Sequence, residues 1–432
     1  MKNMKYFLIT YGCQMNQSDS ERIASLLESI NYKAASKIDE AGLIVVNMCS
    51  IRQSAVDRID GLMNKITKSN GKTKKIKSIL TGCILKKDLK NLKKYFDFIL
   101  PIKTLKTWPN LLKEKQFFYH PDQRNSNFNK KFQSDYFDTI PKNQNNYSAF
   151  IPISSGCNNF CTYCVVPRTR GPLVCRPYQD IIKEVKKFIK NEGKEVWLLG
   201  QNVNDYKSEK IDFPKLLRLI NNIDGNFWIR FTSPHPKDFS DELIKAMADC
   251  KNFKHYLNLP IQSGDNQILK KMNRPYTVAQ YKTLVKKIRQ RIPDISLSTD
   301  VIIGFANETK KQFENTLKVL KEIKYDMAYF AVYSPRPQTI GSKFENNLSK
   351  SEKERRYKLF DKIIKETALE NNKKYIGRIT EVLTNEFKDG VLVGKNDTYK
   401  TVIFEGVKSL VGQFVKVKIN KVTPFGLKGT II

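Results

Sequence analysis

Short apolar runs alternate with amphipathic segments along most of this chain, and this rhythm constrains its fold more than any other feature. One amphipathic segment, residues 180–191, places Ile181, Val185 and Phe188 on one side of a helix. Such a helix covers one face of a parallel sheet in a strand–helix–strand unit. We therefore expect an α/β protein with parallel strands and helices packed on them.

Six strand candidates with helices between them follow one another from residue 149 onward. They span 149–153, 195–199, 227–231, 256–259, 296–303 and 327–332. Six such units predict a partial (βα)6 barrel, whose functional side chains lie in the loops that follow the strands. Polar residues stand in those loops, among them Gln201 and Asn202 after the second strand and Gln262 after the fourth.

A cysteine follows each of the first three apolar runs of the chain: Cys13 after 6–9, Cys49 after 43–46 and Cys83 after 78–80. A lone cysteine at a strand end is usually a small buried hydrophobe. Three of them are expected to converge, because the carboxyl ends of parallel strands meet at one edge of a sheet. After Cys13, Ser18 and Glu21 match a capping box and predict the start of a helix.

Changes in composition predict three domains and one linker. Residues 1–120 form the N-terminal α/β domain, 121–147 are a polar, Asn-rich linker, and 148–372 form the barrel. The last part, 373–432, holds five short β-rich runs with basic loops: 376–383, 391–393, 401–404, 414–419 and 427–431. These runs predict a small OB-like β-barrel of the kind that binds nucleic acid.

The cysteine and histidine content favours iron–sulfur ligation. The chain has eight cysteines and three histidines, and a reducing cytosol uses cysteine for metals or catalysis more than for disulfides. Zinc sites often mix cysteine with histidine, and no histidine lies near the cysteine motifs. The chain also lacks a run of 18 apolar residues and a signal-peptide pattern at its N-terminus. We therefore expect a soluble cytoplasmic protein with no membrane segment.

The charge balance favours a polyanionic partner. Lysine and arginine total 76 against 43 acidic residues, a net charge of +33 that is spread along the chain. Nucleic acid is the leading candidate, because neutralising phosphates releases counterions. A lysine-rich composition of the whole proteome is the alternative explanation.

The clearest chemical motif is the CxxxCxxC of Cys157, Cys161 and Cys164, which directly follows the first barrel strand. Three thiolates on a tight loop can ligate three irons of a [4Fe-4S] cluster and leave the fourth iron open to an external ligand. A zinc site completed by Cys175 and a set of three structural thiols are the alternatives.

Several stretches of the chain resemble the radical S-adenosylmethionine (SAM) tRNA methylthiotransferases, and among them the tRNA-2-methylthio-N6-dimethylallyladenosine synthases. They are YGCQMN (11–16), NMCSIR (47–52), GCNNFCTYCVVP (156–167), GQNV (200–203) and RFTSPHP (230–236). The resemblance covers nearly the whole chain. It implies a methylthiotransferase N-terminal domain, a radical SAM core and a C-terminal TRAM domain.

The resemblance also implies cofactors and a reaction. One [4Fe-4S] cluster would be held by Cys157, Cys161 and Cys164, and an auxiliary [4Fe-4S] cluster by the three cysteines of the N-terminal domain. Two SAM molecules would be consumed: one methylates the sulfur on the auxiliary cluster, and the other yields a radical that abstracts hydrogen from the substrate. The substrate would be C2 of N6-isopentenyladenosine at position 37, in the anticodon loop of tRNA.

The resemblance further implies an electron donor such as flavodoxin or ferredoxin, and a monomer. Weaker candidates for SAM binding are Gln201, Asn202, Gln262 and Asp300, each of which has an alternative role as a loop cap. No catalytic residue is assigned outside the clusters. The sequence departs from the family pattern at Arg168, at 174–175 and at 306–307, which concerns the substrate pocket and not the cluster ligands.

Three readings compete with this one. The first two are sibling enzymes that act on threonylcarbamoyladenosine in tRNA or on a ribosomal-protein aspartate, and the motifs at 14–16 and 201–203 argue against both. The third is a non-catalytic zinc-bearing RNA-binding protein. Of the remaining residues, His235 is expected near substrate, His120 and His255 as structural or surface groups, and Cys250 as packing. Cys175 has no assigned role.

Overall fold

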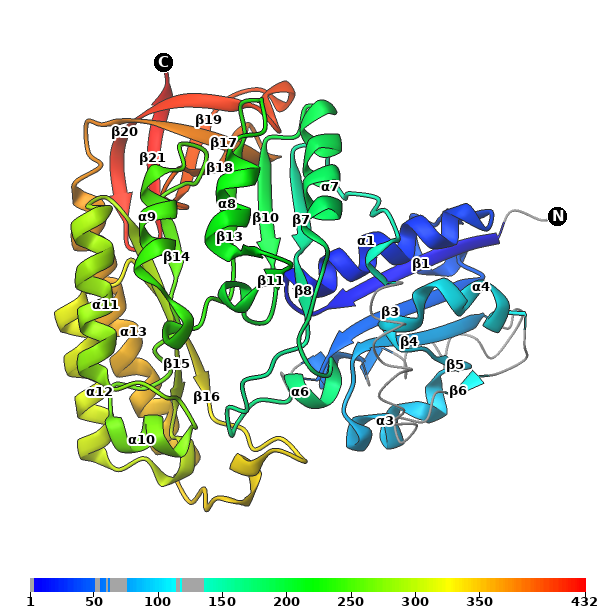
Figure 1. Cartoon of the computed structure of the whole chain (residues 1–432), viewed down its shortest axis with the longest axis horizontal. Helices are drawn as coiled ribbons and strands as arrows, with labels where there is room; N and C mark the ends of the chain where they lie inside the picture. The colour runs from blue at the N-terminus through cyan, green and yellow to red at the C-terminus, as the bar shows by residue number, and fades with distance from the viewer. Residues whose placement is uncertain (1–3, 51–54, 60, 63–75, 114–116, 119–135) are drawn as a thin grey trace.

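The structure is a computed structural model that describes residues 4–50, 55–59, 61–62, 76–113, 117–118 and 136–432. It has an N-terminal α/β domain, a central domain of parallel strands and outer helices, and a C-terminal β-barrel (Figure 1). This arrangement confirms the expected fold class. The expected domain limits at residues 120, 147 and 372 stay predictions, and residues 119–135 of the linker region lie outside the described residues.

The N-terminal domain is built on a six-stranded parallel sheet of order β2-β1-β3-β4-β5-β6. Its central strand β3 alternates between two cores: Val45 packs on one side with Leu27 of helix α1, and Val46 packs on the other with Leu92 of helix α3. Helices therefore cover both faces of the sheet. The elements are β1 (Met4–Tyr11), α1 (Gln14–Ser29), β2 (Tyr32–Ala34), β3 (Leu43–Cys49), β4 (Lys77–Cys83), α3 (Lys86–Leu92), β5 (Phe98–Ile99), α4 (Trp108–Leu111) and β6 (Phe117–Phe118).

Helix α1 begins one residue after Cys13 and not at the expected capping box. Cys13 is the N-cap, and its backbone N–H donates to the Asn16 side chain at 3.2 Å. Ser18 lies inside the helix, where its hydroxyl donates to the Phe150 carbonyl of the central domain at 2.9 Å. The expected helix start was wrong because Asn16 caps the backbone earlier and Ser18 bonds across the domain boundary instead.

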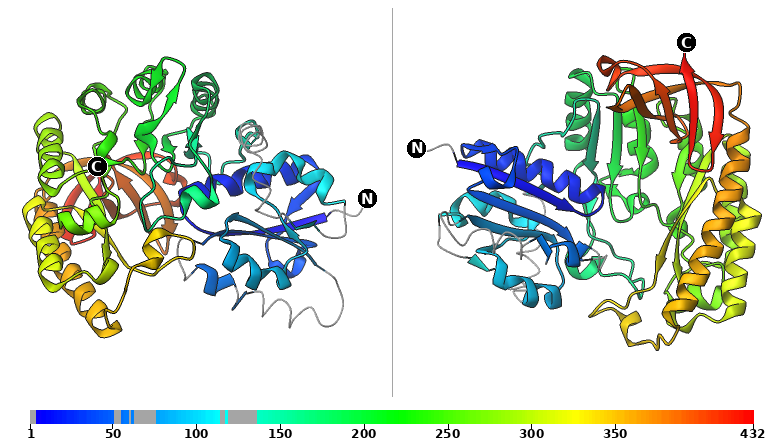
Figure 2. Two further views of the ribbon diagram at one scale, coloured as in Figure 1. Left: turned by 60° about the horizontal axis from the view of Figure 1, so that its bottom comes forward. Right: turned by 180° about the vertical axis from the view of Figure 1, so that it is seen from behind.

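The central domain contains the six expected strands as two parallel three-stranded sheets, β13-β10-β7 and β14-β15-β16. A parallel bridge joins Ile229 of β13 to Phe253, three residues before β14, and so brings the two sheets together into a partial barrel. The strands are β7 (Ser148–Pro152), β10 (Glu195–Leu199), β13 (Trp228–Phe231), β14 (Tyr256–Asn258), β15 (Ser296–Ile303) and β16 (Met327–Val332). The outer helices are α7 (Tyr178–Lys190), α8 (Phe213–Asn221), α9 (Asp241–Asp249), α11 (Val278–Arg291), α12 (Lys310–Ile323) and α13 (Lys350–Lys373), as Figures 1 and 2 show.

The C-terminal domain is a closed five-stranded barrel of order β17-β18-β19-β21-β20. Its strands are β17 (Ile379–Lys388), β18 (Val391–Asn396), β19 (Thr401–Glu405), β20 (Phe414–Thr423) and β21 (Gly426–Ile431). It docks on the central domain through buried Arg230 of β13, which donates to the carbonyl oxygens of Asn396 and Asp397 at 2.8 and 3.0 Å. The same guanidinium pairs with Glu195 of β10 at 2.7 Å, so the contact ties the barrel strands to the C-terminal domain.

Side chains of all three domains meet on the inner face of the partial barrel. Trp197, Leu199 and Tyr256 form an apolar cluster there with Met15 of α1, and Tyr399 of the C-terminal barrel packs against it. The N-terminal domain thus approaches this face from one side and the C-terminal domain from another, as the two views of Figure 2 show. Among the helices that the structure describes, each is too short or too polar to cross a lipid bilayer.

Candidate iron–sulfur site

The three cysteines of the N-terminal domain lie at one edge of its sheet, as expected. Cys49 and Cys83 are the last residues of β3 and β4 and stand opposite each other in the parallel register. Cys13 follows β1, the other neighbour of β3, and caps helix α1. We call these three residues the auxiliary triad. Cys49 and Cys83 are buried whereas Cys13 is exposed, so the group is open on the Cys13 side.

Two asparagines hold the loop of Cys13 against strand β3. The Asn16 amide donates to the Asn47 side chain at 3.0 Å, and the Asn47 amide donates to the Asn16 carbonyl at 2.8 Å. Both side chains are fully buried, where an unpaired amide would be costly. Their exchange of hydrogen bonds therefore fixes Cys13 relative to the sheet edge.

The surroundings of Cys83 lower the pKa of its thiol. A hydrogen bond from Cys49 and the nearby Arg170 guanidinium lower the pKa of Cys83 to about 6, against the opposing effect of burial. Arg170 Nε donates to Cys83 Sγ at 3.0 Å. Because metals bind the thiolate form, this environment favours ligation at Cys83.

The second group, Cys157, Cys161 and Cys164, lies on the loop between β8 (Ser154–Ser155) and α6 (Val166–Thr169); we call it the loop triad. Each of its sulfurs accepts an N–H group. The Asn159 backbone donates to Cys157 at 3.4 Å, the Val166 backbone to Cys164 at 3.5 Å and the Arg274 guanidinium to Cys161 at 3.6 Å. Donors of this kind surround the thiolates of iron–sulfur clusters, so the residues present fit such a group.

Gly156 lets the loop triad fold tightly. Its φ is +82°, and a Cβ atom there would lie 2.0 Å from the Pro172 carbonyl oxygen, so a side chain has no room. The Gly156 N–H donates to the Gln201 side chain at 2.6 Å, and the Cys157 N–H donates to the Gly171 carbonyl at 3.2 Å. Gln201, expected at the SAM site, thus supports the cluster loop directly.

Arg274 reaches the loop triad from a distant part of the chain, with aromatic support. Its Nε donates to the Tyr276 hydroxyl at 2.8 Å, and the His235 ring lies edge-on to Tyr276 with 6.0 Å between centroids. Burial, together with the charges of Arg274 and Lys237, lowers the pKa of His235 to about 3, so His235 is neutral near pH 7. Sequence reasoning missed Arg274, because no motif connects it with the loop.

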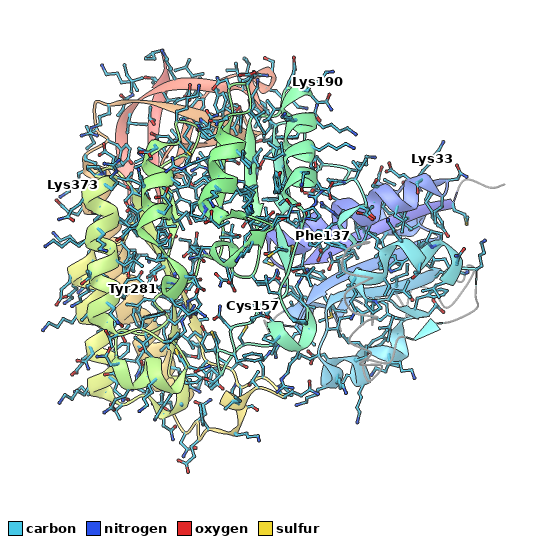
Figure 3. The ribbon with its side chains drawn as sticks, viewed as in Figure 1. Lys33, Phe137, Cys157, Lys190, Tyr281 and Lys373 are labelled. Atoms are coloured by element: carbon cyan, nitrogen blue, oxygen red, sulfur yellow. The ribbon has the colours of Figure 1, made fainter. Side chains whose placement is uncertain are left out.

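A cavity of about 470 Å³ lies between the N-terminal and central domains. Cys161, Cys164 and Arg170 of the central domain line it together with Gly82 of the N-terminal domain. The remaining lining residues are mostly apolar and include Leu85, Leu100, Phe160 and Ile340. In Figure 3, Cys157 lies where the central domain faces the N-terminal domain. The loop triad therefore faces the domain that carries the auxiliary triad.

The other expected SAM-binding residues are associated with different strands of the partial barrel. Asn202 is buried after β10 and donates to Asp238 at 2.8 Å. Gln262 follows β14, bridges to β15 and has a φ of 69°. Asp300 of β15 accepts from Asn258 at 3.0 Å. Gln262 and Asp300 are neighbours through a backbone hydrogen bond of 2.9 Å, whereas Gln201 and Asn202 follow β10 of the other sheet.

The remaining cysteines and histidines stand apart from both triads. Cys250 is buried in the main core of the central domain, and Cys175 is in β9 (Val174–Cys175), paired with β8. His255 is half-buried behind β14, where burial lowers its pKa. His120 lies outside the described residues. Within the part of the chain that the structure describes, no three His, Cys, Asp or Glu side chains are grouped to hold a single metal ion.

Three family models match the chain. Residues 5–100 match "Uncharacterized protein family UPF0004", residues 151–320 match the Radical SAM superfamily, and residues 373–432 match the TRAM domain. The matched ranges follow the three domains of the structure in order. SAM and iron–sulfur chemistry, expected from the sequence, are thereby assigned to this chain.

Curated relatives match over almost the full length. A tRNA-2-methylthio-N(6)-dimethylallyladenosine synthase of Alkaliphilus oremlandii is 38% identical, covering 100% of this chain and 93% of that protein. Proteins of the same name are 37% identical in Clostridium botulinum (99% and 95% covered) and 36% identical in Clostridium novyi (100% and 97% covered).

Solved structures show the same fold at low sequence identity. The radical SAM methyltransferase TsrM of Kitasatospora setae matches with a TM-score of 0.55 and 12% identity, covering 76% of this chain and 73% of that one. The cobalamin-dependent SAM radical enzyme OxsB matches with a TM-score of 0.52 and 11% identity, covering 85% and 56%. The full-length relatives confirm the resemblance seen in the sequence. The chain belongs to the tRNA-2-methylthio-N(6)-dimethylallyladenosine synthase family of radical SAM methylthiotransferases.

Proposed function

We propose that this enzyme inserts a methylthio group at C2 of N6-isopentenyladenosine at position 37 of tRNA, using two [4Fe-4S] clusters and two SAM molecules. One cluster is held by Cys157, Cys161 and Cys164, and the other by Cys13, Cys49 and Cys83. The observation that carries the proposal is the contact of Arg170, which directly follows helix α6 of the central domain, with Cys83 of the auxiliary triad, to which its Nε donates at 3.0 Å. Two cysteine groups that share one interface can act on one nucleobase.

The loop triad binds the cluster that activates SAM. When bound there, SAM supplies a 5′-deoxyadenosyl radical, a species able to attack an aromatic C–H that has no acidic proton. We assign its binding to Gln201, Asn202, Gln262 and Asp300. Gln201 supports this assignment best, because its side chain already touches Gly156 next to the first cysteine.

The auxiliary triad holds the cluster that carries the sulfur. Three protein thiolates leave one iron free, and the exposure of Cys13 beside buried Cys49 and Cys83 puts the open side of the group toward that residue. Met15, two residues further on, packs against Trp197 on the inner face of the barrel. The Cys13 loop thus borders an apolar surface that keeps water from a reactive intermediate.

The C-terminal barrel binds the tRNA in this proposal. The target adenosine leaves the stack of the anticodon loop before it reaches the site, as bases do in enzymes that act on them. A net charge of +33 supports binding of the phosphate backbone. We further propose that the enzyme is a cytoplasmic monomer and receives electrons from a flavodoxin or ferredoxin. We also propose the domain limits 1–120, 148–372 and 373–432, with a linker at 121–147.

A reaction with matched substrates tests the function. The enzyme, reconstituted with iron and sulfide, is incubated with SAM, a reductant and one of three tRNAs: unmodified, carrying N6-isopentenyladenosine, or carrying threonylcarbamoyladenosine. Mass spectrometry of the nucleosides is expected to show a methylthio product from the isopentenylated tRNA alone. A product from the threonylcarbamoylated tRNA alone would reject this substrate in favour of the sibling activity. RNA binding that does not depend on SAM, without any methylthio product, would reject the proposed enzymatic activity in favour of a non-catalytic RNA-binding protein.

A further inference from the structure

The Arg170 side chain leaves the central domain and enters the cysteine site of the N-terminal domain. Its Nη2 donates to the Asp19 carboxylate at 2.6 Å, and its Nε donates to Cys83 Sγ at 3.0 Å. Tyr136 donates to the other carboxylate oxygen of Asp19 at 2.5 Å. Asp19 is fully buried and Arg170 nearly so. The ion pair therefore holds the guanidinium in one orientation, aimed at Cys83.

The backbone around Arg170 is fixed to the loop triad as firmly as its side chain is to the auxiliary triad. Gly171 accepts the Cys157 N–H at 3.2 Å. A Cβ at Gly156 would lie 2.6 Å from the Gly171 carbonyl oxygen and 2.0 Å from that of Pro172. Segment 170–172 and the cluster loop thus pack without space between them. One short segment contacts a cysteine of each triad.

Arginine is well suited to act on a cluster ligand. It stays charged at every accessible pH, and a charge-assisted N–H bond is roughly twice as strong as a neutral one. Hydrogen bonds to the sulfurs of an iron–sulfur cluster favour the reduced state, which carries one more negative charge, and so raise the reduction potential. Arg170 applies such a bond to Cys83, and its charge is compensated by Asp19.

We propose that Arg170 is a positioning residue that raises the reduction potential of the auxiliary cluster through Cys83 and fixes that cluster relative to the loop triad. This inference rests on the proposed function only in placing a cluster at Cys13, Cys49 and Cys83. The companion contact of Arg274 with Cys161, at 3.6 Å, gives the loop triad its own arginine. Each triad thereby has one cationic donor.

The test measures a potential rather than turnover. In full-length protein with Cys157, Cys161 and Cys164 all changed to Ala, the auxiliary cluster is titrated with dithionite and followed by electron paramagnetic resonance. Adding Arg170→Gln is expected to lower the ratio of reduced to oxidised clusters about tenfold at a given potential, a negative shift of about 59 mV for one electron. Arg170→Lys keeps the charge but loses the planar fork, so its shift is expected to be smaller. An unchanged potential in Arg170→Gln would overturn the inference.

Arg176→Gln is the matched control. Arg176 is a buried arginine near the same domain boundary, paired with Glu184 at 2.6 Å, and has no cysteine partner among the described contacts. Its removal is expected to leave the potential unchanged. An equal shift in Arg176→Gln would show that loss of any buried arginine loosens the site, and would refute the specific role of Arg170.

Loss of Arg170 alone leaves the buried Asp19 carboxylate without its cation, and that variant can fail to fold. The double variant Asp19→Asn with Arg170→Gln removes both charges, and the negative shift is expected to remain because the donor to Cys83 is absent. Iron analysis of the triple-alanine parent separates the two proposals. A parent without iron contradicts the auxiliary cluster itself, whereas a parent with iron whose potential ignores Arg170 contradicts only this inference.

Discussion

The two cysteine triads are assembled in opposite ways. Cys157, Cys161 and Cys164 lie on one short loop, and backbone amides of this loop and of the first residue of α6 donate to two of their sulfurs. Cys13, Cys49 and Cys83 come from the ends of three strands and meet only when the parallel sheet has its register. The loop triad is thus a local structure, and the auxiliary triad is a product of the whole domain.

This difference explains why the two sites need different support. The loop depends on close backbone approach at Gly156, and the sheet edge depends on Gly82, whose Cβ would lie 2.2 Å from the Met48 carbonyl oxygen. Arg170 and Arg274 then connect each group to a remote part of the chain. In both triads, therefore, the positions of the sulfur atoms depend on neighbouring residues that are not themselves cluster ligands.

The largest expected effects come from removing one ligand of each triad. Cys157→Ala is expected to abolish both SAM cleavage and product, because the cleaving cluster is lost. Cys13→Ala is expected to retain cleavage and to lose product completely, because only the sulfur carrier is lost. Chromatography of 5′-deoxyadenosine and mass spectrometry of the tRNA nucleosides report the two steps separately.

Cys250→Ala is the control for this pair, since Cys250 is buried in the core of the central domain and belongs to neither triad. It is expected to keep both activities. Normal methylthio product from Cys13→Ala protein would show that the two triads do not divide the work as proposed.

Adding one methyl group at either glycine tests the comparison at the level of the backbone. Gly82 has a φ of +104° and Gly156 a φ of +82°, conformations that alanine adopts only with strain. Each substitution to Ala is expected to remove one cluster, and so roughly half of the iron. Gly156→Ala is expected to lose SAM cleavage, and Gly82→Ala to keep it.

Gly377→Ala serves as the control for strain alone, because Gly377 also has a positive φ of +80° but a Cβ there would meet nothing within 4 Å. Its iron content is expected to be normal. Full iron in both Gly82→Ala and Gly156→Ala would mean that the close approaches do not define the sites.

The smallest effect concerns His235, which packs on Tyr276 behind Arg274. The pKa of His235 falls from 6.5 to about 3 in the folded protein, mainly through burial. Between these values the unfolded chain binds a proton that the folded chain does not, so stability falls as the pH falls through this window. At pH 5 the loss is about 2 kcal/mol relative to neutral pH.

Urea unfolding at pH 7 and pH 5 measures this loss. His235→Asn offers a side-chain oxygen in place of the Nδ1 that accepts the Lys237 N–H at 3.2 Å, and it has no titrating group. The variant is expected to lose about 2 kcal/mol less than the wild type between the two pH values. Equal losses of unfolding free energy in both proteins would show that protonation of His235 does not cause the loss of stability at pH 5.

Much of the fold was predictable, because the spacing of apolar residues and the position of turn residues largely determine where strands and helices lie. The strands expected at 195–199, 296–303 and 327–332 agree with β10, β15 and β16 to the residue. The start of α1 was wrong because a cysteine is an unusual N-cap and Asn16 supplied the missing acceptor. Local rules describe regular elements well and irregular starts poorly.

The candidate site was predictable only as far as the cysteines reach. Their spacing and their place after strands pointed to the two groups, and the grouping at the sheet edge agrees with the register of β3 and β4. Arg170, Asp19 and Arg274 were missed. The Arg170–Asp19 contact joins residues 151 positions apart and the Arg274–Cys161 contact residues 113 apart, and no local pattern carries such information.

Through Tyr399 the C-terminal barrel, which matches the TRAM domain, also contributes to the packing of the central domain. Its ring lies 5.0 Å from Trp197 and 4.6 Å from Tyr256, measured between centroids. It covers these two side chains on the inner face of the partial barrel. A chain that ended before the C-terminal barrel would expose Trp197 and Tyr256 to solvent on the inner face of the partial barrel. The C-terminal barrel, for which we propose tRNA binding, therefore also completes the packing of the partial barrel, and another domain put in its place would have to supply a side chain that fills the position of Tyr399.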